Sequence, residues 1–239
     1  MKIFEIEINK INYSAILEKI VESIKNKKRL LITYVTADCL NKVYSNKILK
    51  NYYSKFNIVH PDGVGVYWAT KFLYGKDGLK ERITGSDFYP VLANEICKNK
   101  WKVFFFGDTE KTNEKLKTTK ITNCLVGSSS GYNFNNEKII QKINESNADI
   151  LFVGLGAPKQ EKWILQNYSN LNTTVIITVG EGIKIFAKIR KRGPKIFRLI
   201  GLEWFIRLLY NPKKFWKRYL IGIPVFIYRV ILFKIKNEN

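Results

Sequence analysis

The segment Ile150-Leu151-Phe152-Val153, followed by Gly154-Leu155-Gly156, is a short run of apolar residues that ends in glycines. A second run of the same kind, Val103-Phe104-Phe105-Phe106-Gly107, lies earlier in the chain. Strands that are apolar at every position are buried on both faces, as in a parallel sheet that helices cover on each side. These two segments therefore predict the centre of a parallel α/β sheet.

Further β-branched or aromatic runs alternate with segments of helical periodicity along the first three quarters of the chain. The predicted strands are 30–35, 56–60, 101–107, 121–127, 149–156 and 173–180. The predicted helices are 13–26, 37–55, 86–99, 110–118, 135–146 and 159–168. This alternation predicts a Rossmann-like, doubly wound, mainly parallel α/β sheet for residues 1–190, the catalytic domain in the interpretation that follows.

Positive charge is concentrated near the C-terminus. The 239 residues include 41 Lys and Arg against 20 Asp and Glu, a net charge of +21. Residues 184–239 alone hold 15 basic residues, two acids and six of the eight arginines. Basic proteins commonly bind phosphate, in nucleic acid, nucleotides or anionic lipid. Biased coding would raise the number of lysines but would not gather the arginines, so this charge indicates a function.

Residues 191–239 are predicted to form a separate basic, helical appendage, because Gly193-Pro194 breaks the preceding pattern and aromatic residues then alternate with basic ones. One interpretation is a solvated helix that packs its aromatic face on the sheet domain. The other is an interfacial element on an anionic membrane. The longest apolar stretch, 219–228, is interrupted by Pro224 and followed by Arg229 and then 230–233, and it is too short to cross a bilayer. No nucleic-acid-binding motif is present.

Ligands of open α/β sheets bind beyond the carboxyl ends of the strands, where this sequence repeatedly places glycine beside a polar residue. Asp62 follows one predicted strand and precedes a glycine-rich turn and a helix. A carboxylate there can act as a general base, or it can cap the helix. Thr36 and Asp38, which follow another strand, have the same two interpretations, and capping is favoured for both.

Several chemistries are disfavoured by what the sequence lacks. Gly154-Leu155-Gly156 is not completed by a third glycine, since position 159 is Lys, which argues against a dinucleotide cofactor. There is no Walker-type phosphate loop and no Asp-x-Asp pair. His60 is the one histidine, which excludes a multi-histidine metal site and most Ser-His triads. The three cysteines lack CxxC spacing, which argues against a zinc site or a disulfide framework.

Taken together and in order, several short segments resemble the WecG/TagA/CpsF family of bacterial glycosyltransferases (glycosyltransferase family 26). The resemblance covers about residues 30–220. The matching segments are Thr36-Ala37-Asp38, Pro61-Asp62-Gly63-Val64-Gly65-Val66, Arg82-Ile83-Thr84-Gly85-Ser86-Asp87, Phe104-Phe105-Phe106-Gly107, Gly131-Tyr132, 153–161, and Gly201-Leu202-Glu203-Trp204 with Arg207, Pro212, Arg218 and Tyr219.

The resemblance implies an inverting, metal-independent and cofactor-free glycosyltransferase. Such an enzyme moves an N-acetylmannosamine-type sugar from a UDP-sugar to a sugar on undecaprenyl diphosphate, in the synthesis of teichoic acid, capsule or another cell-envelope polysaccharide. It also implies a cytoplasmic protein, peripheral on the inner face of the cell membrane, with the appendage on the anionic surface. A homo-oligomer is left open.

The resemblance also assigns roles to residues. Asp62 matches the family's general base, and Thr36 is the second residue expected at the catalytic centre. The further residues expected to bind substrate are Asp38, Arg82, Gly154, Gly156, Gln160, Glu161, Arg207 and Arg218. No metal ligand is expected among them.

The chain departs from the family pattern at three positions. Asp38 stands where the family usually has Asn, Lys184 where it has an acid, and Lys188 where it has Gly. These changes bear on which sugar is used. Two other functions stay open at this point: a basic nucleic-acid-binding module, and a catalytically inactive scaffold of a polysaccharide complex.

Overall fold

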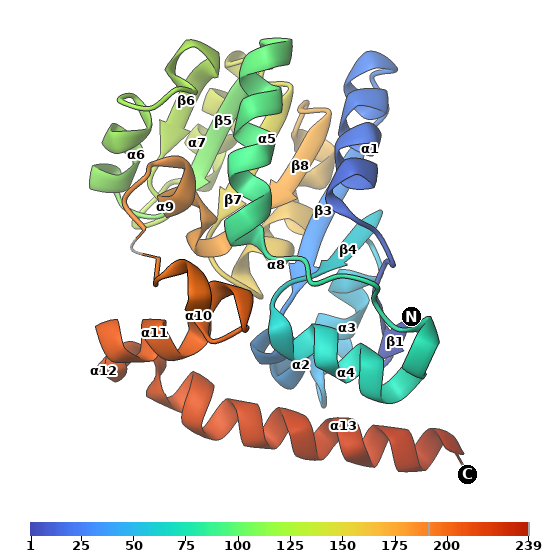
Figure 1. Ribbon diagram of the computed structural model, residues 1–239. Helices are drawn as coiled ribbons and strands as arrows, with labels where there is room; N and C mark the ends of the chain where they lie inside the picture. The colour runs from blue at the N-terminus through green and yellow to red at the C-terminus, as the bar shows by residue number, and fades with distance from the viewer. Residues whose placement is uncertain (191, 239) are drawn as a thin grey trace.

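A computed structural model describes residues 1–190 and 192–238, and its centre is a six-stranded parallel sheet of order β4-β3-β8-β7-β5-β6 (Figure 1). The strands are β3 (Leu30–Val35), β4 (Ile58–Pro61), β5 (Val103–Gly107), β6 (Leu125–Ser129), β7 (Ile150–Gly154) and β8 (Val175–Thr178). Each lies in or overlaps one predicted strand, and all pair in parallel. The two apolar runs, β5 and β7, are neighbours inside the sheet. The predicted α/β class is therefore confirmed.

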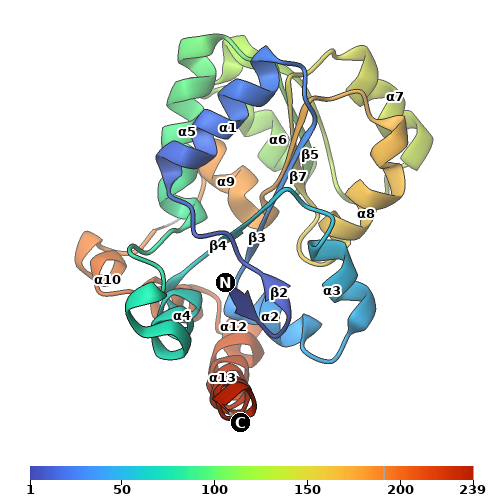
Figure 2. The same ribbon diagram turned by 90° about the vertical axis from the view of Figure 1, so that its right-hand side faces the viewer.

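Helices cover both faces of the sheet (Figure 2). Successive side chains of a strand point to opposite faces, and because the strands are apolar at most positions, both faces bury apolar side chains against helices. One face packs against α2 (Ala37–Val43), α3 (Lys47–Tyr53), α7 (Asn136–Glu145) and α8 (Lys159–Asn167). The other packs against α1 (Tyr13–Lys25), α5 (Gly85–Asn99), α6 (Glu110–Leu116) and α9 (Ile183–Phe186). Short 3-10 turns are η1 (Gly75–Asp77), η2 (Thr122–Cys124), η3 (Tyr168–Asn170) and η4 (Gly180–Gly182).

Two local features differ from the prediction. The predicted helix 37–55 is two helices, since the Asn46 side chain accepts a hydrogen bond from the Leu49 amide (3.0 Å) and so starts α3 anew. The chain also begins with a small hairpin of β1 (Lys2–Ile3) and β2 (Ile6–Glu7), which was not predicted. Its turn residue Phe4 is buried and contacts Phe226 and Phe233 near the other end of the chain.

The C-terminal helices lie beyond the carboxyl ends of the strands (Figure 1). They are α10 (Lys195–Leu199), α11 (Glu203–Tyr210), α12 (Pro212–Trp216), a π-helical turn η5 (Lys217–Ile221) and α13 (Gly222–Glu238). The long helix α13 packs against α2 and against α4 (Val64–Tyr74). In the described part of the chain, no helix has both the length and the apolar character needed to span a bilayer.

Specific contacts fix α13 to the sheet domain. Asn41 on α2 donates a hydrogen bond to the Gly222 carbonyl (2.7 Å), and Arg229 donates one to the Asn41 carbonyl (2.8 Å). Phe226 and Val230 are buried in the apolar cluster that also holds core residues of α2 and α4. Helix α13 is thus part of the packed structure, and the division into domains 1–190 and 191–239 remains a prediction.

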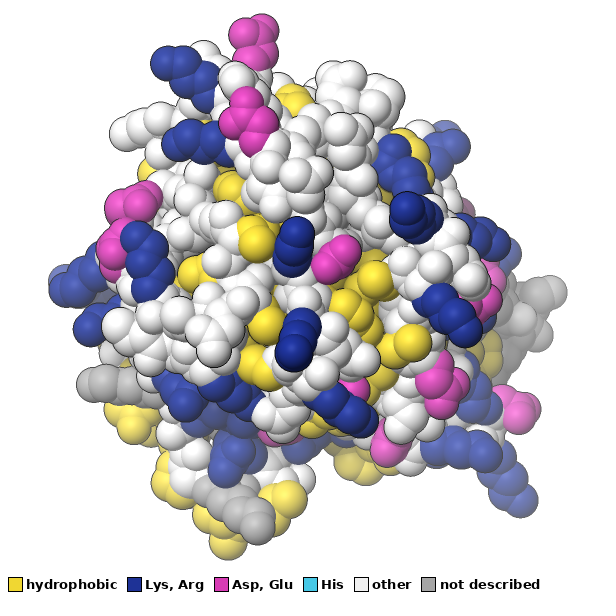
Figure 3. Space-filling view, turned by 90° about the horizontal axis from the view of Figure 1, so that it is seen from above, with side chains coloured by type: hydrophobic (Ala, Val, Ile, Leu, Met, Phe, Trp, Pro, Cys, Tyr) yellow, Lys and Arg dark blue, Asp and Glu magenta, His cyan; other side chains and the backbone are white. Residues whose placement is uncertain are grey.

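The face of the molecule that lies farthest from these helices carries dispersed charge. Figure 3 views the molecule from above the amino ends of the strands, and Lys and Arg side chains are scattered there among Asp and Glu.

A buried polar network joins α8 to the ends of two strands. Glu161 accepts hydrogen bonds from the Thr33 hydroxyl (2.9 Å) and from the Gln160 side chain (2.9 Å), and Gln160 accepts one from the Gly180 amide (3.0 Å). Gln160 and Glu161 are fully buried, and the second carboxylate oxygen of Glu161 has no partner among the described residues. Burial raises the pKa of Glu161 above its ordinary value of 4.5.

We expect Glu161→Gln to be more stable than the wild-type protein at neutral and alkaline pH. The pKa of Glu161 is higher in the folded protein than in the unfolded chain, so the folded protein loses stability as the pH rises from 4.5 through the folded-state pKa. Below pH 4.5 Glu161 is neutral in both states, and this loss disappears. The melting temperatures of the two proteins, measured from acidic to alkaline buffer, should converge in acid and separate as the pH rises. Glu18→Gln, at an exposed site on α1, is the control. A difference that does not vary with pH would contradict the assignment.

Candidate active site

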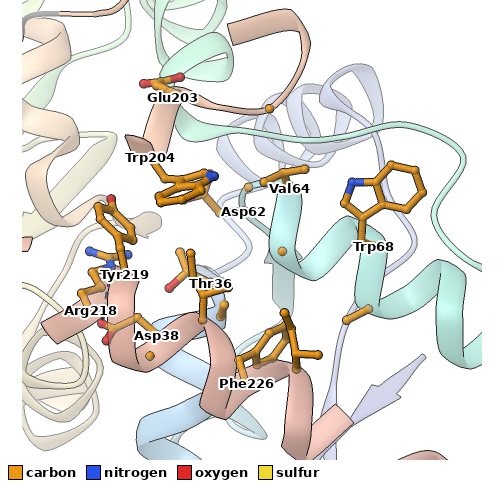
Figure 4. A pocket seen from close by; sticks show the side chains of 18 of the residues that line it. Thr36, Asp38, Asp62, Val64, Trp68, Glu203, Trp204, Arg218, Tyr219 and Phe226 are labelled. Carbon is orange, nitrogen blue, oxygen red and sulfur yellow. Dashed lines mark ion pairs between the residues drawn. The ribbon is translucent and has the colours of Figure 1, made fainter. Parts of the chain in front are cut away.

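A cavity of about 480 Å³ lies beyond the carboxyl ends of β3 and β4, between the sheet domain and the C-terminal helices (Figure 4). It is lined by the loops after these two strands, by residues 82–86, and by parts of α11, η5 and α13. Its polar lining residues are Thr36, Asp38, Asp62, Arg82, Thr84, Ser86, Glu203, Arg207, Arg218 and Tyr219. The position agrees with the expectation that ligands of such sheets bind at the carboxyl ends of strands.

The structure brings together most of the residues predicted for the site. Those that line the cavity are Thr36, Asp38, Asp62, Arg82, Arg207 and Arg218. Gly154, Gly156, Gln160 and Glu161 are outside its lining. Gln160 and Glu161 belong to the buried network, and a Cβ added at Gly154 would collide with Ile183 and with the Gly180 carbonyl. Gly154 ends β7 and Gly156 lies in the loop after it, whereas Gln160 and Glu161 are in the first turn of α8.

Asp62 follows β4 and lies at the cavity wall. Its backbone amide donates to the Val35 carbonyl (2.8 Å), and its carboxylate accepts from the Gly85 amide (2.8 Å), at the start of α5. The cap of the helix after it is Gly63, at a φ of +90°, so Asp62 does not cap α4 as the alternative interpretation had it. Within the described residues no other donor reaches this carboxylate, so its second oxygen accepts no hydrogen bond from them.

Thr36 and Asp38 start the helix that follows β3. The Thr36 hydroxyl accepts a hydrogen bond from the Cys39 amide (3.2 Å), which confirms that Thr36 caps α2. Asp38 lies in the first turn and does not cap it, contrary to the favoured interpretation. Its carboxylate is 2.8 Å from Lys42 and 3.9 Å from the Arg218 Nε atom. Asp38 therefore connects the first turn of α2 to an arginine of the C-terminal segment.

Three guanidinium groups from distant parts of the chain line the same cavity. Arg82 donates a hydrogen bond to the Arg198 carbonyl (2.6 Å). Burial opposes the charge of Arg218, but its neighbours Tyr219 and Asp38 together raise its pKa, so the group stays charged. Arg207 pairs with Glu203 at 3.6 Å. Guanidinium groups bind diphosphates with paired hydrogen bonds, so this end of the cavity suits a diphosphate.

Glu203, at the start of α11, pairs with Arg207 and with two further arginines, and sequence reasoning did not select it. Its carboxylate lies 3.8 Å from Arg190, 3.6 Å from Arg192 and 3.6 Å from Arg207, and it accepts a hydrogen bond from the Ser86 hydroxyl (3.3 Å). Arg192 also pairs with Asp87 (2.7 Å). Burial would raise the pKa of Asp87, but hydrogen bonds from Arg192 and Thr84 lower it. The sequence does offer a clue to Glu203, because it is one of only two acidic residues in the basic segment 184–239.

Sequence reasoning also did not predict the apolar half of the cavity, which is lined by Trp68 and Phe72 of α4 and by Phe226 of α13. Two further departures from the family pattern lie elsewhere. Lys184 is 3.6 Å from Asp108 and 3.9 Å from Glu181, outside the cavity lining. Lys188 has a φ of +55° at the end of α9, a conformation that glycine adopts with less strain.

Comparisons with known proteins agree with the resemblance noted in the sequence. The model of the family described as "Glycosyl transferase WecG/TagA/CpsF family" matches residues 1–239. Proteins of Staphylococcus aureus strains NCTC 8325 / PS 47 and COL are each 29% identical over 233 residues, which is 92% of this chain and 89% of theirs. Both are named N-acetylglucosaminyldiphosphoundecaprenol N-acetyl-beta-D-mannosaminyltransferase.

We expect Glu203→Gln to loosen the C-terminal helices from the sheet domain. The change keeps the shape of the side chain but leaves Arg190, Arg192 and Arg207 close together without their shared counter-charge. The predicted cost is about 1–3 kcal/mol of unfolding free energy. Hydrogen exchange of residues 192–210 should become faster than in the wild-type protein.

The matched control is Glu95→Gln, which removes the ion pair between a partly exposed Glu95 and an exposed Lys98 and should change stability by less than about 0.5 kcal/mol. Denaturant titration and hydrogen-exchange mass spectrometry provide both readouts. Unchanged exchange in residues 192–210 of Glu203→Gln would show that this carboxylate does not hold the helices.

Proposed function

This chain belongs to the WecG/TagA/CpsF family of glycosyltransferases, and from this premise we propose that it transfers an N-acetylmannosamine-type sugar from a UDP-sugar to N-acetylglucosamine on a polyprenyl diphosphate. The observation that carries the proposal is one cavity lined by an available carboxylate, Asp62, and by three arginines. The names of the relatives describe transferases that act on such an acceptor. The product would enter a cell-envelope polysaccharide such as teichoic acid.

In the proposed step, an acceptor hydroxyl attacks the anomeric carbon of the donor sugar. A new carbon–oxygen bond forms, the bond to the β-phosphate breaks, and UDP leaves with the electron pair. The hydroxyl proton passes to the second oxygen of Asp62, which has no donor among the described residues. Attack from the side opposite the leaving group inverts the anomeric centre. The Gly85 amide holds the other Asp62 oxygen and fixes the orientation of the carboxylate.

Arginines supply the positive charge that the leaving UDP requires. Negative charge develops on the β-phosphate as the bond breaks, and fixed cations in a partly enclosed site stabilise it. Arg82, Arg207 and Arg218 line the cavity and come from separate segments. We propose that these groups stabilise the departing diphosphate without a metal ion, and that Thr36 and Asp38 position the substrates beside them.

The C-terminal helices are proposed to rest on the inner face of the cell membrane. Many of the large apolar side chains that are exposed belong to α10, α11 and η5, including Leu199, Leu209 and Leu220. Lysines and arginines alternate with them along this part of the chain. Apolar side chains at the headgroup boundary with basic residues on anionic lipid form a peripheral membrane contact. Residues 191–239 would then be the docking appendage of the catalytic domain.

The two alternative functions have less support. An inactive scaffold was suggested by Asp38 and Lys184, yet Lys184 lies outside the cavity and Asp38 contacts Arg218 within it. A nucleic-acid-binding module requires a surface of clustered, exposed basic residues. Here four of the eight arginines, Arg190, Arg192, Arg207 and Arg218, are paired with Glu203, Asp87 or Asp38.

Asp62→Asn should lower kcat by about 10²- to 10⁴-fold, the usual contribution of a general base. The fold should be kept, because an amide oxygen can still accept the hydrogen bond from Gly85. Transfer from UDP-N-acetylmannosamine to a lipid-diphosphate N-acetylglucosamine is measured with and without EDTA, and the wild-type rate should be the same in both.

Asp77→Asn, at an exposed position, is the control for that substitution. Near-wild-type turnover by Asp62→Asn would rule out Asp62 as the base. A wild-type rate that EDTA abolishes would rule out metal independence. UDP-sugar binding with no turnover by the wild-type protein would favour the scaffold.

Leu199→Glu should weaken binding to vesicles of anionic phospholipid by about tenfold, because it removes an apolar contact and adds a charge that anionic lipid repels. Ile48→Glu, equally exposed on α3 and far along the chain from the appendage, should bind as the wild-type protein does. Flotation of the vesicles with bound protein measures the binding of each variant. Equal loss in both variants, or binding to DNA stronger than binding to vesicles at the same salt concentration, would contradict the proposed membrane contact.

A further inference from the structure

The cavity has two chemically different halves. The charged residues in its lining come from the first turn of α2, the loop after β4, the loop before α5, and α11 and η5, and together they form the polar half. The other half runs between α4 and α13 and is lined by uncharged residues. In Figure 4, Thr36, Asp38 and Arg218 lie on one side, and Trp68 and Phe226 lie on the other. A ligand that fills both halves must be anionic at one end and apolar at the other.

The apolar half is a groove with a buried floor and an exposed rim. Trp68, Ala69 and Phe72 form the α4 wall, at the three- and four-residue spacing that places side chains on one helix face. Ile223, Phe226, Ile227, Val230 and Ile231 form the α13 wall at the same spacing. Residues 223–231 span about 12 Å at 1.5 Å per residue. The groove is therefore long enough for the first few branched units of an isoprenoid chain.

The exposure of the rim indicates that the groove is left open for a ligand. Ala69, Phe226 and Val230 are buried and form the floor. Trp68, Phe72, Ile227 and Ile231 also line the groove, yet they remain exposed. Apolar side chains on two facing walls that stay in contact with water gain free energy when an apolar chain covers them.

We propose that this groove binds the polyprenyl chain of the acceptor, directly next to the diphosphate and the sugar. The inference rests on the proposed function, since it assumes a lipid-linked acceptor. With the chain between α4 and α13, the acceptor diphosphate lies where the two halves meet, beside the arginines that hold the UDP diphosphate, and the sugar reaches Asp62, because the two halves form one continuous cavity. The enzyme then recognises the lipid itself, rather than only the membrane in which the lipid is held.

Binding of farnesyl diphosphate, a soluble prenyl diphosphate, tests this site without turnover. Isothermal titration should show that farnesyl diphosphate binds the wild-type protein at least about tenfold more tightly than inorganic diphosphate, because apolar area is buried only with the prenyl chain. Ile227→Gln and Ile231→Gln should each remove most of that preference and leave the affinity for inorganic diphosphate unchanged.

Helix α13 offers a matched control for each variant. Ile227 and Ile231 line the groove and are 53% and 43% exposed, whereas Tyr228 and Ile235 are 63% and 51% exposed and do not line it. Tyr228→Gln and Ile235→Gln should therefore keep the wild-type preference for farnesyl diphosphate. Glutamine is neutral and helix-compatible, so neither the charge of α13 nor its folding is altered.

Three outcomes would overturn the proposal: no preference for farnesyl over inorganic diphosphate, an equal loss in the lining and control variants, or equally tight binding of a short-chain phosphatidylglycerol at the same site. The last result would assign the groove to bulk membrane lipid. Failure of the proposed function is a separate result, because it would appear as absent sugar transfer by a wild-type protein that still prefers the prenyl chain.

Discussion

The candidate active-site cavity depends on the attraction between one carboxylate, that of Glu203, and the arginines around it. Arg190, Arg192 and Arg207 would repel one another if they were brought together without it. With Glu203 among them, α11 lies against residues 82–86 and the C-terminal helices close over the ends of β3 and β4. The turn before α11 is also restricted, both in its backbone conformation and in the space around it. Gly201 has a φ of +83°, and a Cβ there would lie 2.8 Å from the Val64 side chain.

This closure divides the chemistry between two parts of the chain. The sheet domain supplies the carboxylate of Asp62 and the first turn of α2, and the C-terminal segment supplies Arg207, Arg218 and one apolar wall. Neither part forms the cavity alone. Because Phe226 and Val230 of α13 are also buried against the sheet domain, deletion of residues 191–239 would uncover core side chains. Point substitutions on exposed positions therefore separate membrane binding from folding more clearly than truncation does.

The sequence was sufficient to predict the fold and several of the residues that line the candidate site. Apolar runs such as Val103–Gly107 predict the strands because burial on both faces leaves a local pattern. Asp62 and Arg218 were identified from motifs, yet motif membership did not separate them from Gln160, which carries a buried structural hydrogen bond. The groove between α4 and α13 was not predicted, because its two walls are far apart in the sequence. The sequence of each wall, taken by itself, has only the pattern of an ordinary amphipathic helix.

A structure of the protein with an unreactive UDP-sugar analogue and a short-chain prenyl diphosphate N-acetylglucosamine would test this account most directly. The account predicts the acceptor sugar beside the Asp62 carboxylate, the diphosphates among Arg82, Arg207 and Arg218, and the prenyl chain between α4 and α13. Both substrates bound over the loops after β5, β7 and β8, with the cavity of Asp62 unoccupied, would contradict it.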